Sequence, residues 1–233
     1  AVLRALNLSE QVPFVWDIAF VEIFEGEKKG FDIVIGNPPY VEQEKIAPPA
    51  ERPEEHGGEN SEEWKRLKRG YKAKLQHSVA VAWPRFFIYR LKDDKQGRKL
   101  DGKSDYYVYF YLHGLRLLNE KGSFCFITSN SWLDVGYGKD LQEFLLKHSQ
   151  VKLILDNEVK RSFAQADVHT IIALFAPAND RKNWGLDRTA RFVMFRVPFE
   201  YIVSPVIFDE IEETDERKAT PEYRAFPIQQ GIL

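Results

Sequence analysis

The residues Asn37-Pro38-Pro39-Tyr40 place two hydrogen-bond acceptors and an aromatic ring directly after a strand-like segment. The preceding residues, FDIVI at 31–35, are β-branched or aromatic except for Asp32, which predicts a buried strand ended by Gly36 and the two prolines. Because proline fixes its own backbone angle, Pro38 and Pro39 make this turn rigid. The carboxyl end of a strand in an open α/β sheet is where such folds bind ligands. The sequence therefore predicts a ligand site at this turn.

The chemistry open to this turn follows from its acceptors. The side-chain carbonyl of Asn37 and the backbone carbonyl of Pro38 can each accept a hydrogen bond from an exocyclic amino group on a planar base. Accepting from both N–H bonds withdraws the nitrogen lone pair from conjugation with the ring and makes the nitrogen a nucleophile. Tyr40 offers a flat face on which the base can stack. A base must leave its duplex to enter such a pocket.

Helices and strands alternate along the chain, which predicts an α/β sheet covered on both faces. We expect strands at residues 31–35, 123–128, 151–155 and 169–175, and helices at 105–119 and 139–148. Ser104 is the expected cap of the first helix, and Lys121-Gly122 its expected end. The segment 179–191 is polar and is typical of a linker. Residues 192–207 are apolar but contain two prolines, so we assign no definite element there.

The formal net charge of −2 hides a strong separation of charge along the chain. Residues 64–103 contain thirteen lysines and arginines against three aspartates, with aromatic residues between them. Residues 42–63 contain eight glutamates, and residues 209–216 contain six acidic residues. Either these are ordinary solvated faces, or the basic stretch contacts nucleic-acid phosphates. The predicted DNA contacts are Lys65, Arg66, Lys68, Arg69, Lys72 and Lys74.

The turn at residues 36–40 resembles motif IV of the amino-group DNA methyltransferases, and NPPY after an apolar strand resembles the adenine-N6 enzymes of restriction-modification systems. Further segments resemble later motifs of that family in the same order. They are SDYYVYF at 104–110 for motif V, GSFCFITSNSWL at 122–133 for motif VI, YGKDL at 137–141 for motif VII, and Phe163 for motif VIII. The resemblance covers roughly residues 12–176.

The resemblance implies a type II restriction-modification enzyme that transfers a methyl group from S-adenosylmethionine to N6 of a flipped adenine in double-stranded DNA. It implies catalytic roles for Asn37, Pro38, Pro39 and Tyr40. Tyr40 and Phe163 would contact the base, and Asn37 and Tyr106 the cofactor. Such an enzyme would work in the cytoplasm of a prokaryote. With no apolar run near the ~20 residues of a membrane span, we expect no membrane partner.

Half of the family's sheet is not recognisable in this sequence. The family sheet has seven strands and binds its cofactor at a glycine-rich loop, whereas the four expected strands correspond to the second half. The sequence DVGYG at 134–138 is expected to be a turn before a helix, not that loop. We therefore expect a partial Rossmann-like methyltransferase core at residues 1–177, and a linker with the start of a target-recognition region at 178–233. The missing half could precede residue 1 or follow residue 233.

Two consequences and two alternatives follow. The chain alone should bind S-adenosylmethionine poorly, and its strand near Phe31, with an unpaired edge, should self-associate or bind a partner that completes the sheet.

A first alternative is a Mg²⁺-dependent nuclease that uses Asp156, Glu158 and Lys160. A second is a DNA-binding fragment without catalysis. One cysteine and five scattered histidines make a metal site unexpected.

Overall fold

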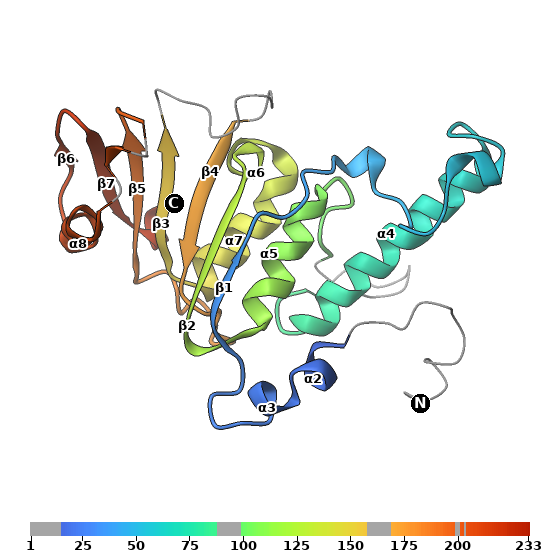
Figure 1. The fold of residues 1–233 in the computed structure, drawn as a ribbon, viewed down its shortest axis with the longest axis horizontal. Coiled ribbons are helices and arrows are strands. Elements are labelled where there is room, and N and C mark those ends of the chain that lie inside the picture. The colour runs from blue at the N-terminus through green and yellow to red at the C-terminus, as the bar shows by residue number, and fades with distance from the viewer. Residues whose placement is uncertain (1–14, 88–98, 158–168, 199–200, 203) are drawn as a thin grey trace.

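The centre of the molecule is a seven-stranded mixed sheet with the strand order β1-β2-β4-β3-β5-β7-β6 (Figure 1). The computed structural model describes residues 15–87, 99–157, 169–198, 201–202 and 204–233. The strands are β1 Phe31–Gly36, β2 Leu118–Ser129, β3 Val151–Asn157, β4 Thr170–Phe175, β5 Thr189–Phe195, β6 Lys218–Ala219 and β7 Tyr223–Gln229. The expected α/β architecture is confirmed, and all four expected strands are present.

Two strand pairs are parallel and the others are antiparallel. β1 runs parallel to β2, with Gly36 opposite Phe126, and β3 runs parallel to β5. β4 lies between β2 and β3 and is antiparallel to both. Because β1 and β2 run in the same direction, their carboxyl ends lie at the same edge of the sheet, where the NPPY turn begins.

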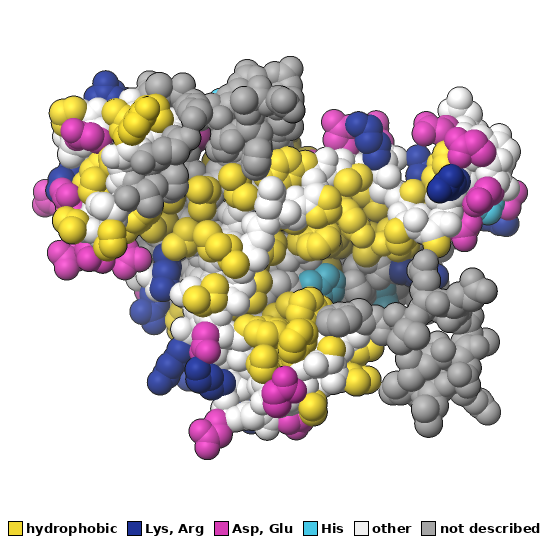
Figure 2. Space-filling model, viewed as in Figure 1, with side chains coloured by type: hydrophobic (Ala, Val, Ile, Leu, Met, Phe, Trp, Pro, Cys, Tyr) yellow, Lys and Arg dark blue, Asp and Glu magenta, His cyan; other side chains and the backbone are white. Residues whose placement is uncertain are grey.

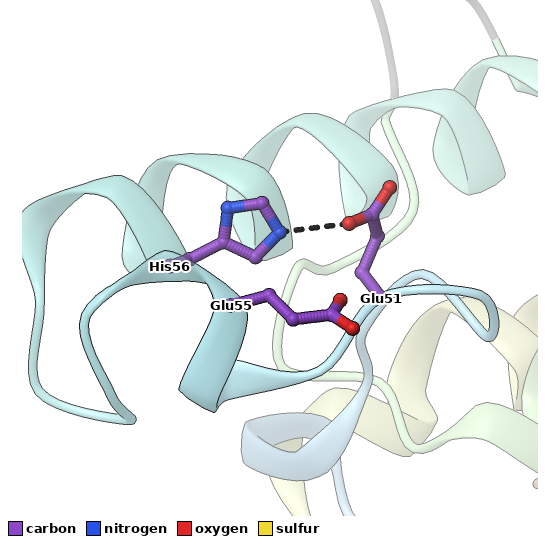
Figure 3. Close-up of side chains that lie close together, drawn as sticks. All are labelled: Glu51, Glu55 and His56. Atoms are coloured by element: carbon purple, nitrogen blue, oxygen red, sulfur yellow. Dashed lines mark hydrogen bonds and ion pairs between the residues drawn. The ribbon is translucent and has the colours of Figure 1, made fainter.

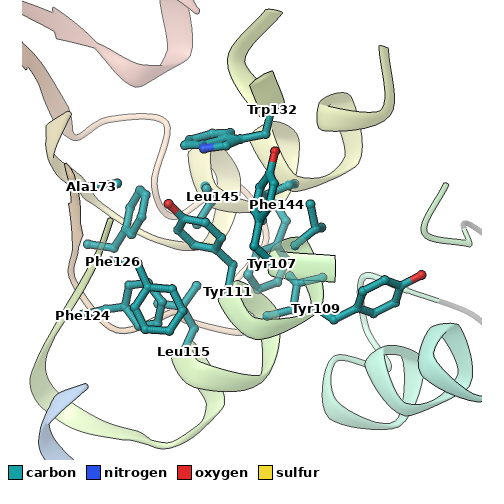
Figure 4. Close-up of a cluster of buried hydrophobic side chains, with 14 of the residues drawn as sticks. Tyr107, Tyr109, Tyr111, Leu115, Phe124, Phe126, Trp132, Phe144, Leu145 and Ala173 are labelled. Atoms are coloured by element: carbon teal, nitrogen blue, oxygen red, sulfur yellow. The ribbon is translucent and has the colours of Figure 1, made fainter. Parts of the chain in front are cut away.

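Helices cover the two faces of this sheet unequally. They are α2 Trp16–Ala19, α3 Val21–Phe24, α4 Glu62–Ala82, α5 Tyr106–Arg116, α6 Ser131–Asp134, α7 Lys139–His148 and α8 Pro205–Glu213. Helices α5, α6 and α7 pack on one face through an aromatic cluster that includes Tyr111, Phe124, Phe126 and Trp132 (Figure 4). Helix α8 buries Ile211 in a second cluster with residues of β3, β5 and β7. None of the described helices is long and apolar enough to cross a bilayer.

Strand β1 was expected to be covered on both faces, but it exposes apolar side chains on one of them. Ile33 and Ile35 are 68% and 76% exposed, whereas Val34, which points to the opposite face, packs against the aromatic cluster. In the described residues β1 pairs with β2 and with no other strand. In the view of Figure 2, apolar side chains form a broad band across the middle, and charged side chains gather at the ends that carry α8 and the start of α4 and also in the lower part of the view.

Two adjoining boundaries were predicted wrongly: the end of α5, and the start of β2, which lies at Leu118 and not at residue 123. α7 spans the expected residues 139–148, but α5 ends at Arg116 because the next residues begin β2, with Leu118 opposite Phe31. Gly122 therefore lies inside a strand, where a Cβ would meet the carbonyl oxygen of Phe31 at 2.9 Å. Ser104 is not the cap either, since Asp105 occupies the N-cap position.

The segment after residue 177 joins the same sheet. β5 begins at Thr189, inside the expected linker, and pairs with β3, while β7 and β6 extend the sheet beyond it. The Phe192 to Phe195 part of the unassigned stretch is strand, and Pro205 starts α8. The assignment of residues 178–233 to the start of a target-recognition region stays a prediction.

Candidate functional site at the carboxyl ends of β1 and β2

The NPPY turn begins at the end of β1, where Gly36 pairs with Phe126 of the neighbouring strand β2. A Cβ on Gly36 would lie 2.9 Å from Cε1 of the buried Phe126 ring, so a side chain at this position would force the ring or the strand to shift. After it, Asn37 and Pro39 are exposed and Pro38 is buried. The Asn37 side chain has no hydrogen-bond partner among the described residues. Its amide is therefore available to a ligand at this edge.

Tyr40 is tied to the neighbouring strand. Its hydroxyl donates to the backbone carbonyl of Ile127 in β2 at 3.2 Å. Burial raises the pKa of Tyr40 to about 12, so the hydroxyl keeps its proton and remains a donor. The bond fixes the direction of the aromatic ring relative to the sheet.

The residues that follow Tyr40 are held by the start of α5. The backbone N–H of Tyr106 donates to the carbonyl of Val41 at 2.9 Å, and the N–H of Gln43 donates to Oδ1 of Asp105 at 2.9 Å. The other carboxylate oxygen of Asp105 accepts from the hydroxyl of Tyr137 at 2.5 Å. Asp105 therefore joins the segment behind the turn to η3, the 3-10 turn Gly136–Gly138.

Helix α4 holds the same segment from its other side. Lys72 donates from Nζ to the side-chain carbonyl of Gln43 at 2.6 Å and to its backbone carbonyl at 3.2 Å. Lys68, one helical turn earlier, donates to the backbone carbonyl of Glu44 at 2.9 Å. Gln43 and Glu44 belong to the 3-10 turn η1, Gln43–Lys45. Burial lowers the pKa of Lys72, and the nearby charge of Lys68 lowers it further.

The six cations predicted to bind DNA thus divide into two groups, all on α4. Lys68 and Lys72 bind carbonyl groups of the chain itself. Arg66, Arg69 and Lys74 are exposed, and so is Lys65, whose ammonium pairs with Glu62 at 3.0 Å. Figure 1 shows α4 extending away from the sheet, so its exposed side can meet a large ligand. The sequence showed the charge but not this division.

Two of the predicted ligand contacts are not placed at the turn. The hydroxyl of Tyr106 lies 3.1 Å from that of Tyr71 on α4, and its ring meets Phe110 edge-on at 5.3 Å. Tyr106 therefore reaches the turn through its backbone, and its contact with a cofactor stays a prediction. Phe163 lies outside the described residues.

One cluster of titratable side chains was not expected from the sequence. Glu51, Glu55 and His56 bring possible metal-ligand atoms within 4.8 Å of one another (Figure 3). Nε2 of His56 lies 2.7 Å from Glu51, and Nδ1 lies 3.2 Å from Glu63 at the start of α4. Hydrogen bonds to Glu51 and then Glu63 raise the pKa of His56. With both ring nitrogens facing carboxylates, His56 acts as a clamp between η2, Pro53–His56, and α4.

The residues of the nuclease alternative are only partly described. Asp156 is the penultimate residue of β3, and its Oδ1 accepts from the N–H of Asn157 at 2.7 Å. Nδ1 of His169 lies 3.9 Å from the same oxygen. Glu158 and Lys160 lie outside the described residues, so this group stays a prediction.

Comparisons with known proteins place these features in a wider group. Residues 5–163 match the family model described as Eco57I restriction-modification methylase. The chain is 29% identical over 126 residues to the Type II methyltransferase M.BstVI of Geobacillus stearothermophilus, covering 54% of this chain and 16% of that protein.

Two solved structures were also matched to this chain. The type IIG restriction endonuclease BpuSI matches with a TM-score of 0.51 and 13% identity, over 85% of this chain and 19% of that chain. The methyltransferase subunit of a type I restriction-modification system from Streptococcus thermophilus matches with a TM-score of 0.49 and 14% identity, over 88% of this chain and 36% of that chain. The chain spans less than a fifth of M.BstVI and of BpuSI.

Proposed function

Because this chain belongs to the Eco57I restriction-modification methylase family, we propose that it forms part of a DNA methyltransferase that modifies N6 of a flipped adenine. The observation that carries the proposal is the placement of Asn37 to Tyr40 at the carboxyl ends of two parallel strands, with the Asn37 side chain exposed and Tyr40 anchored to β2.

The roles of the residues follow from their hydrogen-bonding capacity. The side-chain carbonyl of Asn37 and the backbone carbonyl of Pro38 accept from the two N–H bonds of the adenine amine, which frees the nitrogen lone pair. Pro39 keeps the turn rigid. Tyr40 stacks on the flipped base, and Phe163 contacts its other side. The amine is itself the nucleophile, so no covalent enzyme intermediate is needed.

The described residues fit only part of a cofactor site. S-adenosylmethionine supplies a methyl group on a sulfonium when it is bound. Gly138 is packed so closely on Trp132 that a Cβ on Gly138 would clash with the backbone carbonyl oxygen of Trp132. The segment DVGYG is therefore the expected turn before α7. No glycine-rich loop follows a strand within the described part of the chain. We expect weak binding of S-adenosylmethionine to this chain alone, which calorimetry measures directly.

DNA is the proposed macromolecular partner. The exposed cations Lys65, Arg66, Arg69 and Lys74 would neutralise phosphates of double-stranded DNA along α4. The same surface supports a second candidate, in which the chain on its own holds DNA without methylating it. The proposed setting is the cytoplasm of a prokaryote, as part of a type II restriction-modification system.

The exposed side of β1 is proposed to be the place where the sheet is completed. Its second edge and the side chains of Ile33 and Ile35 offer backbone hydrogen bonds and apolar area to further strands and helices. In the absence of such a partner, two copies of this chain would associate through the same edge.

The test of the proposal is the variant Asn37→Ala in the full-length parent protein. We expect transfer of labelled methyl groups to duplex DNA to fall by roughly a hundredfold or more, the usual cost of removing one polar contact made in the transition state. Duplex affinity should change little, because Asn37 is not among the phosphate contacts. Asn37→Asp, which keeps an oxygen acceptor at the same place, is the matched control and should retain more activity. Methylation by Asn37→Ala at the wild-type rate would show that the turn is not the catalytic site.

A further inference from the structure

The segment that follows the NPPY turn is held in place by two lysines of α4. Lys72 donates two of the three N–H groups of its ammonium to the side-chain and backbone carbonyls of Gln43. Lys68 lies on the same face of the helix, four positions earlier, and binds the carbonyl of the next residue, Glu44. One face of α4 therefore donates hydrogen bonds to the backbone carbonyls of two consecutive residues.

The other side of this segment is bound as well. The N–H of Gln43 donates to Asp105, so its backbone N–H, backbone carbonyl and side-chain carbonyl all have partners from other elements. The carbonyl of Val41 accepts from Tyr106. Residues 41–44 are thus fixed between α4 and the start of α5. Tyr40 directly precedes this segment in the chain, and its hydroxyl is fixed to Ile127.

We infer that Lys72, supported by Lys68, is a positioning residue that sets the height and direction of the NPPY turn, and that it does not contact DNA phosphates. A small rotation of residues 41–44 would move Tyr40, because a single peptide bond separates it from the clamped carbonyl of Val41. The inference rests on the proposed function only where it says what the turn is positioned for. The clamp itself is a property of this chain.

Hydrogen exchange of this chain tests the clamp without any activity. Lys72→Met keeps the apolar stem of the side chain and removes the donors, and Lys74→Met is the matched control, since Lys74 is exposed on the same helix. We expect the amides of residues 41–46 to exchange at least roughly tenfold faster in Lys72→Met, because a charged hydrogen-bond donor is lost. The same amides should be unchanged in Lys74→Met. Lys72→Arg, which keeps a charged donor, should restore part of the protection. Circular dichroism shows that each variant is folded.

Duplex binding over a range of salt concentrations separates positioning from phosphate contact. The slope of log affinity against log salt is negative, and loss of one phosphate contact lowers its magnitude by about 0.9. We expect Lys74→Met to make this slope less steep and Lys72→Met to leave it unchanged. Equal loss of slope in both variants, or unchanged exchange of residues 41–46 in Lys72→Met, overturns the inference.

The inference and the proposed function fail separately. Faster exchange in Lys72→Met, together with a full-length parent that methylates no base, supports the clamp and contradicts the methyltransferase. Unchanged exchange in Lys72→Met, together with a parent that loses methylation in Asn37→Ala, contradicts the clamp and supports the methyltransferase. If this chain binds no duplex, the proposed DNA surface fails and hydrogen exchange alone decides the role of Lys72.

Discussion

The hydroxyl of Tyr40 donates to the backbone carbonyl of Ile127 at 3.2 Å, which joins the NPPY turn after β1 to the adjacent strand β2. The side chain proposed to stack on a base is therefore held at both ends, by its own backbone and by its hydroxyl. This bond restricts the ring before any ligand arrives, and such preorganisation lowers the cost of binding.

Removing this hydroxyl should cost stability while leaving the aromatic face. We expect Tyr40→Phe to lower the free energy of unfolding by about 0.5–1.5 kcal/mol, because the Ile127 carbonyl loses its side-chain donor. Urea unfolding measures the change. Tyr201→Phe is the control, since Tyr201 is 83% exposed and should lose almost nothing. Equal stability of Tyr40→Phe and wild type would contradict a structural role for the bond.

A side chain at position 36 is expected to lower the stability of the fold. In Gly36→Ala the new methyl group meets the Phe126 ring at 2.9 Å, and we expect a loss of about 1–3 kcal/mol in the free energy of unfolding from overpacking. Gly70→Ala is the contrast, because Gly70 lies inside α4 with open space around it. That change should stabilise the chain by up to about 1 kcal/mol through helix propensity. A Gly36→Ala variant as stable as the wild type would contradict the account of Gly36.

The His56 clamp should make stability depend on pH. Its pKa is raised in the folded chain by Glu51 and then Glu63, so the stabilisation is fully present below the unfolded value of about 6.5. It is lost as pH rises through the folded pKa. NMR titration of the His56 ring should show a lower pKa in Glu51→Gln and an unchanged one in Glu59→Gln, an exposed glutamate of the same segment. A pKa of His56 that is the same in Glu51→Gln as in the wild type would contradict the clamp.

The exposed face of β1 should govern self-association. Replacing Ile33 and Ile35 together by threonine removes exposed apolar area and should reduce association in light scattering, with little change in unfolding. Val34→Thr is the control. Val34 packs against the core, so the hydroxyl of the introduced threonine would be poorly solvated. We expect that variant to lose about 1–3 kcal/mol without losing association. Association that persists in the double variant would show that another surface is responsible.

The local pattern of the sequence predicted the elements that carry their own signals. The apolar spacing of Leu141, Phe144 and Leu145 predicted α7, and the β-branched run before Gly36 predicted β1. The end of α5 was predicted too late, because Leu117 and Leu118 continue a helical pattern while Leu118 pairs with Phe31, far away in sequence. Such pairing depends on tertiary structure and leaves no local trace.

The site was predicted in part for the same reason. The NPPY turn is a local motif, so its residues and its position after β1 were found from sequence. Six basic residues of α4 had the same appearance in sequence, although Lys72 faces Gln43 and Lys74 faces solvent. Asp105 was predicted only as the start of a helix and as part of the SDYYVYF segment, and its carboxylate proved to bridge Gln43 and Tyr137. Which groups meet across α4, α5 and the turn is decided by packing alone.

The most direct measurement is mass spectrometry of nucleosides from duplex DNA incubated with the full-length parent protein and S-adenosylmethionine. The two acceptors at Asn37 and Pro38 suit an exocyclic amine, and NPPY after β1 favours adenine. The account predicts N6-methyldeoxyadenosine in the wild-type reaction and its loss in Asn37→Ala. Methylated cytosine in place of methylated adenine, or N6-methyldeoxyadenosine at equal levels in both reactions, would contradict it.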